Sequence, residues 1–469
     1  MRTLTCLLLV LALPAMATED PPMRLGSKAQ ASEQVPPPSG EGDTLRFPAP
    51  QLSQDAPAAS VLTQPMASLT LPREHGTTPM KPGRFVRILP QHLEMARAAW
   101  TYFESQYQPD TGLVNSVRGY RETTLWDVAS AIAGTLAARE LGLIEETVFL
   151  TRINALLHTL ASMPLYDDAL PARRYHTDTG LPVTNDHNHQ INGSGWSALD
   201  IARTLGWLAI LKQRRPDLAA AIQRITQRWA LTRLVSQGQV TGARYTARGE
   251  RHYQEGRLGY EQYAAAALTL WGLAPDQAWA PSFRERVVLE KGSLWADRRD
   301  RPFLTSDPFY LWQLELGTNP GQFRPLSDAV FDAHKRQFQR TGQAHCFGED
   351  AADRAPWFLY NNLHYQGKPW LATDHQGQAQ AFSQILSTKC ALAWGALSQD
   401  TLGSELWQQG TSMMRSRGWL TGRYDDGTLN TSLNLNTNGV VLTVLLYIHN
   451  GNRPLLETDH LDSTRLLDQ

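Results

Sequence analysis

Cysteine is scarce in this chain, with only three in 469 residues, and Cys6 lies in the apolar start. No CxxC pair and no Cys/His spacing typical of zinc is present, so the sequence argues against a disulfide scaffold and a structural zinc domain. Only Cys346 and Cys390 remain after the first 17 residues. An oxidising compartment would allow them to pair, and the sequence leaves that pairing open.

Charge of one sign is also lacking, since 44 Lys and Arg residues face 45 Asp and Glu residues and no basic stripe occurs. Nucleic acid is therefore not expected as a partner. After the first 17 residues no apolar run is long enough for a membrane-spanning helix. The chain has no GxSxG elbow and no phosphate-binding loop, and we expect no cofactor.

The first residues are typical of a secretory signal. Arg2 precedes an apolar run over 4–13, and Ala15-Met16-Ala17 supplies small residues for cleavage. We expect a signal peptide over 1–17 and a periplasmic or secreted protein. Residues 18–83 are rich in Pro and Ser and have no periodicity, which predicts a disordered linker. A folded domain over 84–456 and a C-terminal tail over 457–469 complete the expected organisation.

Helical periodicity dominates the body of the chain, because apolar residues recur at three- and four-residue spacing. The expected helices lie near 91–107, 125–141, 146–162, 196–213, 217–233, 260–272, 283–291, 307–317, 324–340, 377–398, 402–415 and 438–449. Short β-hairpins are expected in loops near 173–184, 239–253 and 419–430. Twelve helices joined by alternating short and long loops predict an all-α (α/α)6 toroid of six helical hairpins. An open solenoid would show a fixed repeat, which the sequence lacks.

The stretch Glu122-Thr123-Thr124-Leu125-Trp126-Asp127 places two carboxylates around a tryptophan, where a helical run begins. Acids at the first turn suit the positive end of the helix dipole, so capping explains them. An acidic, aromatic sugar site at the mouth of a helical barrel explains them as well.

A second acidic motif, Gly259-Tyr260-Glu261-Gln262-Tyr263, precedes a helix of small residues. Aromatic neighbours would desolvate Glu261 and favour the neutral form that a general acid requires. A helix-start carboxylate satisfied by backbone amides is the competing interpretation.

Longer phrases carry a family resemblance. They include Asp110-Thr111-Gly112-Leu113-Val114-Asn115-Ser116, Gly195-Trp196-Ser197-Ala198-Leu199-Asp200-Ile201, Asp307-Pro308-Phe309, Gly348-Glu349-Asp350, Ala355-Pro356-Trp357-Phe358 and Asn436-Thr437-Asn438-Gly439. With them the chain resembles the bacterial family known as domain of unknown function 3131 over nearly all of 84–450. The two acidic motifs also resemble, more weakly, those of glucoamylase-like β-1,2-glucanases. The resemblance implies an (α/α)6 toroid and inverting hydrolysis of an exported polysaccharide.

Inverting hydrolysis needs one protonated carboxyl and one carboxylate about 6.5–9.5 Å apart. Carried over by motif, Glu261 is the expected acid and Asp127 the expected base, with Glu122 as its competitor. The glucanase motif differs at one point, because it has an asparagine between tyrosine and glutamate, whereas Glu261 directly follows Tyr260. That difference turns a side chain on a helix by about 100°.

Further residues are candidates for sugar binding because they lie in polar, aromatic motifs. These are Trp126, Trp196, Tyr260, Glu315, Glu349, Asp350, Trp357 and Asn188, with Trp312 and Trp370 as further stacking platforms. Glu315 is equally explained as the buried partner of an arginine. Asp200 is expected to pair with Arg203 or a neighbouring loop. His187 and His189 match no strong ligand pattern, so no metal is expected.

Three functions follow from this sequence. The leading hypothesis is an exported glycoside hydrolase acting on an exopolysaccharide or periplasmic glucan, with polysaccharide secretion machinery as a further partner. A non-catalytic glycan-binding protein of such a system needs the aromatic cleft but no working pair of carboxylates. A polysaccharide lyase on the same fold would use Tyr260, His187 or His189 as its base.

Overall fold

The computed structural model describes residues 83–184, 193–246, 249–289 and 292–457. The expected signal peptide, nearly all of the expected linker and most of the expected tail lie outside these ranges. The sequence motif that contains Asn188, His187 and His189 lies outside them too. Among the described residues no helix is both long and apolar enough to cross a bilayer.

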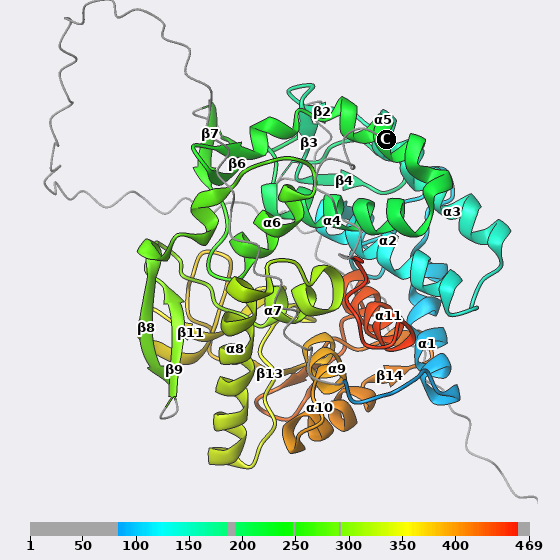
Figure 1. The fold of residues 1–469 in the computed structure, drawn as a ribbon. Helices are drawn as coiled ribbons and strands as arrows, with labels where there is room; N and C mark the ends of the chain where they lie inside the picture. Colours follow the sequence, from blue (N-terminus) through cyan, green and yellow to red (C-terminus); the bar gives the residue numbers. More distant parts are fainter. Residues whose placement is uncertain (1–82, 185–192, 247–248, 290–291, 458–469) are drawn as a thin grey trace, which may run out of the picture. The chain divides into compact units, whose positions relative to one another are not determined.

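Six helices form a closed ring at the centre of the domain (Figure 1). They are α2 (Leu125–Glu140), α4 (Ala198–Arg214), α6 (Tyr260–Thr269), α7 (Asp307–Leu311), α9 (Thr388–Leu397) and α11 (Leu435–His449). Each contacts the next in this order, and α11 contacts α2. Nearly every residue of α11 is buried, and so is most of α2. Helices that are apolar or small on all sides are suited to such a buried ring.

Five further helices pack outside the ring. They are α1 (Pro90–Gln106), α3 (Glu146–Ser162), α5 (Ala219–Arg228), α8 (Pro320–Thr341) and α10 (Thr401–Thr411). Their apolar residues occupy one face only, as in α5, where Ile222 and Ile225 are buried. Between α6 and α7 the outer position holds two short 3₁₀ helices, Asp276–Trp279 and Pro281–Phe283, and a β-hairpin.

The helix expected over 283–291 is wrong. The residues form strand β8 (Arg284–Leu289), which pairs antiparallel with β9 (Gly292–Asp297). The β-branched pair Val287 and Val288 favours a strand, and most of β8 lies at the surface, where its polar residues meet water. The helix expected over 377–398 begins only at Thr388, because strand β13 (Gln384–Ser387) precedes it.

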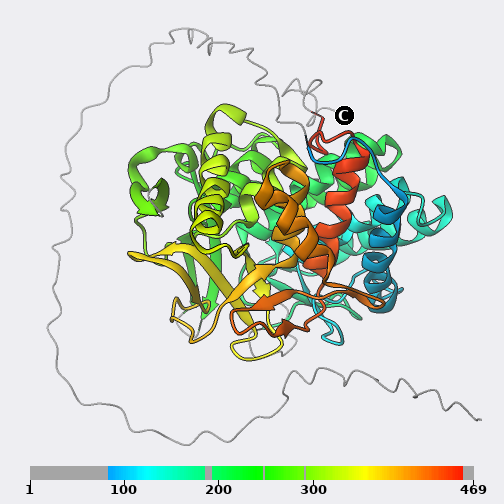
Figure 2. The same cartoon turned by 90° about the horizontal axis from the view of Figure 1, so that it is seen from below.

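Short strands lie where the chain enters the ring helices, at their N-terminal ends (Figure 2). The strands before α2 and α4 are β1 (Glu122–Thr124), β2 (Leu165–Tyr166), β3 (Leu170–Pro171) and β4 (Arg174–His176). Those before α6 are β5 (Val235–Ser236), β6 (Gln239–Thr246) and β7 (Gly249–Gln254). The later strands are β10 (Glu349–Ala351), β11 (Phe358–Tyr365), β12 (Lys368–Thr373), β14 (Met414–Arg415), β15 (Gly418–Trp419), β16 (Gly422–Tyr424) and β17 (Leu429–Asn430).

Hairpins β6–β7 and β16–β17 confirm two of the three expected hairpin positions. In the third, near 173–184, Tyr175 of β4 bridges antiparallel to Pro182 of its own loop, and the strand also pairs with β1. The β10–β11–β12 sheet is an addition to the expected elements. A disulfide joins Cys346 to Cys390, which fixes the segment before β10 to the ring helix α9.

A buried ion pair lies inside the ring. Arg203 of α4 donates to Glu315, 3.0 Å away, and both side chains are 0% exposed. Glu315 follows α7 in a π-helical turn, Trp312–Leu316. The Arg203 guanidinium also donates to Ser130 of α2 and to Asn436 of α11, and the Tyr263 hydroxyl of α6 donates to Glu315. Segments from five positions of the ring therefore share one buried charge pair.

Glu315→Gln should lower the free energy of unfolding by about 3–5 kcal/mol, because it leaves the buried Arg203 charge without its counterion. Urea denaturation followed by circular dichroism measures the change. Glu146→Gln is the matched control, since Glu146 pairs with Arg139 at the surface, and we expect an unchanged denaturation midpoint. Equal midpoints for both variants would contradict a stabilising role of the buried pair.

Candidate active site

Asp127 stands at the third position of α2, behind the N-cap residue Thr124. The Thr124 hydroxyl accepts from the Asp127 amide at 3.2 Å and donates to the Asp127 carboxylate at 3.0 Å. The carboxylate is partly accessible. Burial raises the pKa of Asp127, while hydrogen bonds from Ser116 and Thr124 oppose that rise. Asp127 therefore supports the helix start, and its side chain is not fully buried.

Asp200 repeats this arrangement on α4. The Ser197 hydroxyl caps the helix by accepting from the Asp200 amide at 3.3 Å. Burial, together with the neighbouring charges of Glu255 and Asp127, raises the pKa of Asp200 to about 7. The expected pairing of Asp200 with Arg203 is wrong, because the Arg203 guanidinium turns inward to Glu315.

Glu255 lies beneath Asp200 and is held by three partners. It accepts from Arg173 at 3.2 Å, from the Tyr253 hydroxyl at 3.1 Å and from the Ala198 amide at the start of α4 at 2.5 Å. The Arg173 guanidinium thus balances one of the two carboxylates. Among the described residues Asp200 forms no ion pair, although the charge of Arg173 opposes the rise of its pKa.

Glu349, at the start of β10, is the third accessible carboxyl. It accepts from the Thr305 hydroxyl at 3.1 Å and from the Tyr260 hydroxyl. Burial and the nearby charge of Asp307 raise the pKa of Glu349 to about 8, although Lys389 acts in the opposite direction. This carboxyl is therefore protonated at neutral pH.

A buried charge cluster supports Glu349 from below. Lys389 of α9 contacts Asp307 and lies 3.6 Å from Asp350, and it donates to the Glu349 carbonyl at 2.7 Å. The Asp307 carboxylate accepts from the Glu349 amide at 2.9 Å. One buried cation thus faces two buried aspartates and fixes the backbone of Glu349. Asp350, an expected sugar-binding residue, belongs to this cluster and is buried.

Electrostatic effects connect the three accessible carboxyls. Asp127 and Asp200 act on each other electrostatically, and Glu349 and Asp200 both act on the Tyr360 hydroxyl. They enter from α2, α4 and β10, at the N-terminal ends of the ring helices. Helix N-termini stabilise negative charge, which offsets part of the cost of gathering carboxylates there.

Aromatic rings line the same site. Trp126 and Tyr260 pack with ring centroids 5.5 Å apart, and both are partly accessible, as expected for sugar-binding residues. Tyr260 reaches this position because Gly259 turns the chain with a φ of 97°, where a Cβ would come within 2.7 Å of Pro308 and Phe309. Tyr360 lies opposite and stacks on Phe303 at 4.4 Å.

Glu261 lies apart from this group. Its carboxylate accepts from Arg299 at 2.7 Å and from Gln254 at 3.0 Å, and Arg299 also binds Asp297. Burial raises the pKa of Glu261, while Arg299 opposes the rise. Tyr260 and Glu261 are neighbours on a helix and so point about 100° apart. The hydrogen bonds of the Glu261 carboxylate go to Arg299 and Gln254, whereas the Tyr260 hydroxyl bonds to Glu349.

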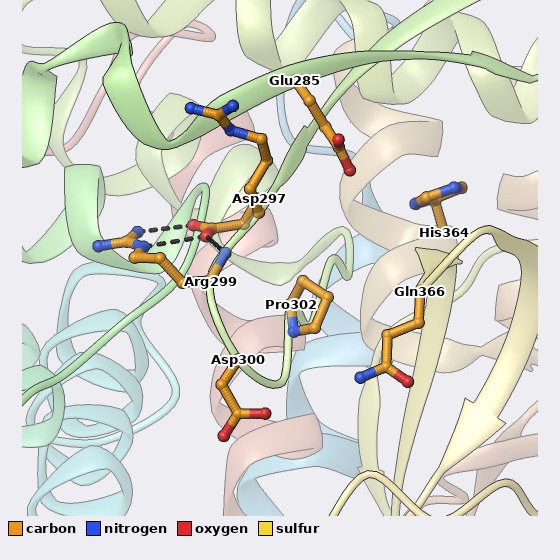
Figure 3. Close-up of a pocket in the computed structure, with 8 residues that line it drawn as sticks. Glu285, Asp297, Arg299, Asp300, Pro302, His364 and Gln366 are labelled. Carbon is orange, nitrogen blue, oxygen red and sulfur yellow. Dashed lines mark hydrogen bonds and ion pairs between the residues drawn. The ribbon is translucent and has the colours of Figure 1, made fainter. Parts of the chain in front are cut away.

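Arg299 lines a separate pocket of about 280 Å³ (Figure 3). Figure 3 shows Arg299 bound to Asp297, with Glu285 and His364 facing the same space from strands β8 and β11. Its lining includes none of Asp127, Asp200 and Glu349.

The remaining expected site residues divide by burial. Trp196 and Glu315 are 0% exposed, so the prediction that they contact sugar is wrong. The Trp196 indole donates to the Thr241 carbonyl, and Glu315 is the buried partner of an arginine, its alternative interpretation. Glu122 lies under the site, where it binds Tyr120 and Arg174. Trp357 is 43% exposed, beside Phe358 at the start of β11.

Among the expected stacking platforms, Trp312 is buried against Phe323 and Trp370 packs on Phe347. The sequence reasoning missed Glu255, Lys389, Arg173 and Tyr360 as parts of the site. Asp307 appears in one of the family phrases, which was the available signal for it. Within the described ranges, no group of three or more His, Cys, Asp or Glu side chains is arranged to hold a metal ion.

Comparison with models of protein families identifies the family of this chain. The model of the family described as protein of unknown function DUF3131 matches residues 94–451. The chain belongs to this family. The resemblance based on its sequence phrases is thereby confirmed. Among curated proteins the comparison finds no match.

Solved structures share the fold at low sequence identity. A candidate glucoamylase from Bacteroides caccae aligns with a TM-score of 0.55 and 14% identity over 78% of this chain and 94% of its own. An endo-β-1,2-glucanase from Chitinophaga pinensis, in complex with sophorotriose and glucose, gives 0.55 and 11% over 78% and 93%. The sophorose complex of an endo-β-1,2-glucanase from Talaromyces funiculosus gives 0.52 and 13% over 77% and 85%. The fold is thus shared with glucoamylase-like proteins, and the weaker resemblance to β-1,2-glucanases is confirmed.

The raised pKa of Glu349 predicts a pH dependence of stability. Its pKa is 4.5 when unperturbed and about 8 in the folded chain. Between these values the folded state binds a proton that the unfolded state has released, so the free energy of unfolding falls as pH rises. Glu349→Gln should reduce that slope by one proton between about pH 4.5 and 8.

Urea denaturation at a series of pH values measures this slope. Glu104→Gln, on the exposed face of α1, is the control and should keep the wild-type slope. A slope that is the same in wild type and Glu349→Gln would contradict the protonated state of Glu349.

Proposed function

We propose that this protein is an exported glycoside hydrolase that cleaves a polysaccharide in the cleft formed by Asp127, Asp200 and Glu349. The observation that carries the proposal is that burial and the Asp307 charge raise the pKa of Glu349 to about 8, whereas hydroxyl hydrogen bonds oppose the rise at Asp127. A glycosidase of the inverting type needs one protonated and one ionised carboxyl at the same pH. Aromatic rings beside them provide faces for pyranose C–H groups.

The six ring helices support an (α/α)6 toroid as the architecture. Five of them have a long outer helix as partner, and the sixth outer position holds the two 3₁₀ helices and the β8–β9 hairpin. In this toroid the strands and long loops surround the N-terminal ends of the ring helices, where the three carboxyls lie.

Glu349 is our choice for the general acid. It keeps its proton to about pH 8, and the Tyr260 hydroxyl and the backbone fixed by Asp307 hold it in place. Its proton goes to the glycosidic oxygen as the bond to the anomeric carbon breaks. Glu261, expected from the motif, has its carboxylate bound to Arg299 on the other side of α6 and lacks access to that oxygen.

Asp127 is our choice for the general base, in agreement with the sequence motif. Hydrogen bonds from Ser116 and Thr124 favour its ionised form. The carboxylate takes a proton from the water that attacks the anomeric carbon on the face opposite Glu349, which inverts the configuration. The Asp127 charge acts on Asp200, and Asp200 and Glu349 both act on the Tyr360 hydroxyl. We therefore assign Asp200 to the binding of a sugar hydroxyl.

The substrate class follows from the fold and from the expected location. The structures with the same fold include endo-β-1,2-glucanases, one of them bound to sophorose. A signal peptide and the Cys346–Cys390 disulfide suit an oxidising compartment outside the cytoplasm. An exopolysaccharide or periplasmic glucan is therefore the proposed substrate, and secretion machinery stays a predicted partner.

Release of reducing ends from linear β-1,2-glucan and other bacterial glycans tests the activity. We expect Glu349→Gln and Asp127→Asn each to lose about 10²–10⁴-fold in kcat, because each removes a proton-transfer group. Glu261→Gln is the matched carboxyl control and should keep wild-type kcat. A Glu349→Gln variant as active as wild type would rule out Glu349 as the acid.

The stereochemistry of the first product tests the mechanism. Proton NMR during the first turnovers should show the anomer opposite to that of the substrate linkage, since a single displacement inverts the configuration. Retention would contradict the assignment of Asp127 as a base. Binding without turnover would instead support a glycan-binding protein, and an ultraviolet-absorbing unsaturated product would support a lyase with Tyr260 as its base.

A further inference from the structure

Two arginines of the β6–β7 hairpin face each other without a carboxylate. Arg244 and Arg251 are direct cross-strand partners, so their side chains leave the same face of the hairpin. Both are exposed. Among the residues that the structure describes, neither forms an ion pair. Like charges directly opposite on paired strands destabilise a hairpin.

Arg244 belongs to the cleft. Its guanidinium lies 5.1 Å from the ring centroid of Tyr253, whose hydroxyl donates to Glu255 beneath Asp200. Its charge also acts on the Tyr360 hydroxyl, the group that Glu349 and Asp200 affect from the other side. A row of side chains therefore runs from Glu255 through Tyr253 to Arg244, and then to Arg251 towards the end of the hairpin.

Three other arginines, in contrast, have carboxylate partners. Arg173 is bound to Glu255, and Arg174 lies 3.4 Å from Glu122. Arg121 is bound to Asp178. Arg244 and Arg251 therefore carry positive charge that is not paired with a carboxylate among the described residues. At neutral pH the three carboxyls of the site carry less negative charge than their number suggests, because the raised pKa of Glu349 favours its protonated form.

We propose that the cleft takes an anionic glycan, and that Arg244 and Arg251 bind a carboxylate, phosphate or sulfate group on a sugar next to the cleaved linkage. A guanidinium matches such groups with two parallel N–H donors. An anion placed between the two arginines also relieves their mutual repulsion. This inference rests on the proposed function, since it names the substrate class of the same cleft.

Matched ligands separate charge from chain recognition. Linear β-1,2-glucan and the same glucan after O-succinylation share one backbone, and polygalacturonate supplies an anionic chain of another backbone. Calorimetry on full-length Glu349→Gln protein measures binding while the chains stay intact. We expect the succinylated glucan or polygalacturonate to bind at least tenfold more tightly than the neutral glucan, with an affinity that falls as salt rises.

Arg244→Gln, added to Glu349→Gln, should weaken binding of the anionic chain by about tenfold or more and leave the neutral chain unchanged. Arg244→Lys should keep part of the affinity, because it retains the charge without the paired donors. Arg286→Gln is the matched control, since Arg286 is an exposed arginine of the β8–β9 hairpin that binds Ser293. Its affinities should equal those of the parent.

Tighter binding of the neutral glucan, equal loss of both ligands in Arg244→Gln, or binding of none of the three chains would overturn the inference. The proposed function is judged separately, by reducing ends released by the wild-type protein. Cleavage of neutral glucan with no effect of Arg244→Gln would uphold the hydrolase and reject the anionic substrate. If no chain is hydrolysed but binding depends on the charge of the chain, the hydrolase is rejected and the anionic ligand is upheld.

Discussion

The buried ion pair between Arg203 and Glu315 is the constraint on which the ring of helices depends. Inside a closed ring no water is available to solvate a charge, so each group must find its partners among the helices. Arg203 meets Ser130 and Asn436, and Glu315 meets Tyr263. These contacts join segments far apart in sequence at one depth of the ring. A shift of α2, α4, α6, α11 or the segment after α7 would break them, so the pair fixes the relative level of these five segments.

Two opposing effects act on the carboxyls of the site, because the helix dipoles favour their negative charge and burial disfavours it. The ring helices bring their N-termini to one end, and the positive dipole ends attract carboxylates. Gathering Asp127, Asp200 and Glu349 there, with Asp307 and Asp350 beneath, places several negative charges in a poorly solvated space. One buried lysine, Lys389, and one arginine, Arg173, neutralise only part of them. Burial raises the pKa values of the remaining carboxyls, and a raised pKa is what a general acid needs at neutral pH.

The sequence predicted the helices well where periodicity and caps agree. Thr124 and Ser197 mark the starts of α2 and α4, and apolar spacing marks their lengths. The helix expected over 283–291 failed because an apolar Val-Val-Leu run fits either period, and the tertiary partner β9 decides between them. The role expected for Glu261 depends on the direction of one side chain. Helix geometry sends Tyr260 and Glu261 to different surroundings, and only the positions of Glu349 and Arg299 show which surroundings belong to the cleft.

Asp127 shows why capping and catalysis are not alternatives at such a site. Thr124 is the N-cap and Asp127 the third residue after it, and Ser197 and Asp200 repeat the same spacing. The N-cap hydroxyl accepts the hydrogen bond from the backbone amide of the acid. The carboxylate of the acid is therefore not fully used to cap the helix end. The bonds from Thr124 that orient Asp127 also favour its ionised form, which is the form a base needs. The cap therefore orients the Asp127 carboxylate at the N-terminal end of α2. Removing the Thr124 hydroxyl would disturb the helix start and the proton affinity of Asp127 together.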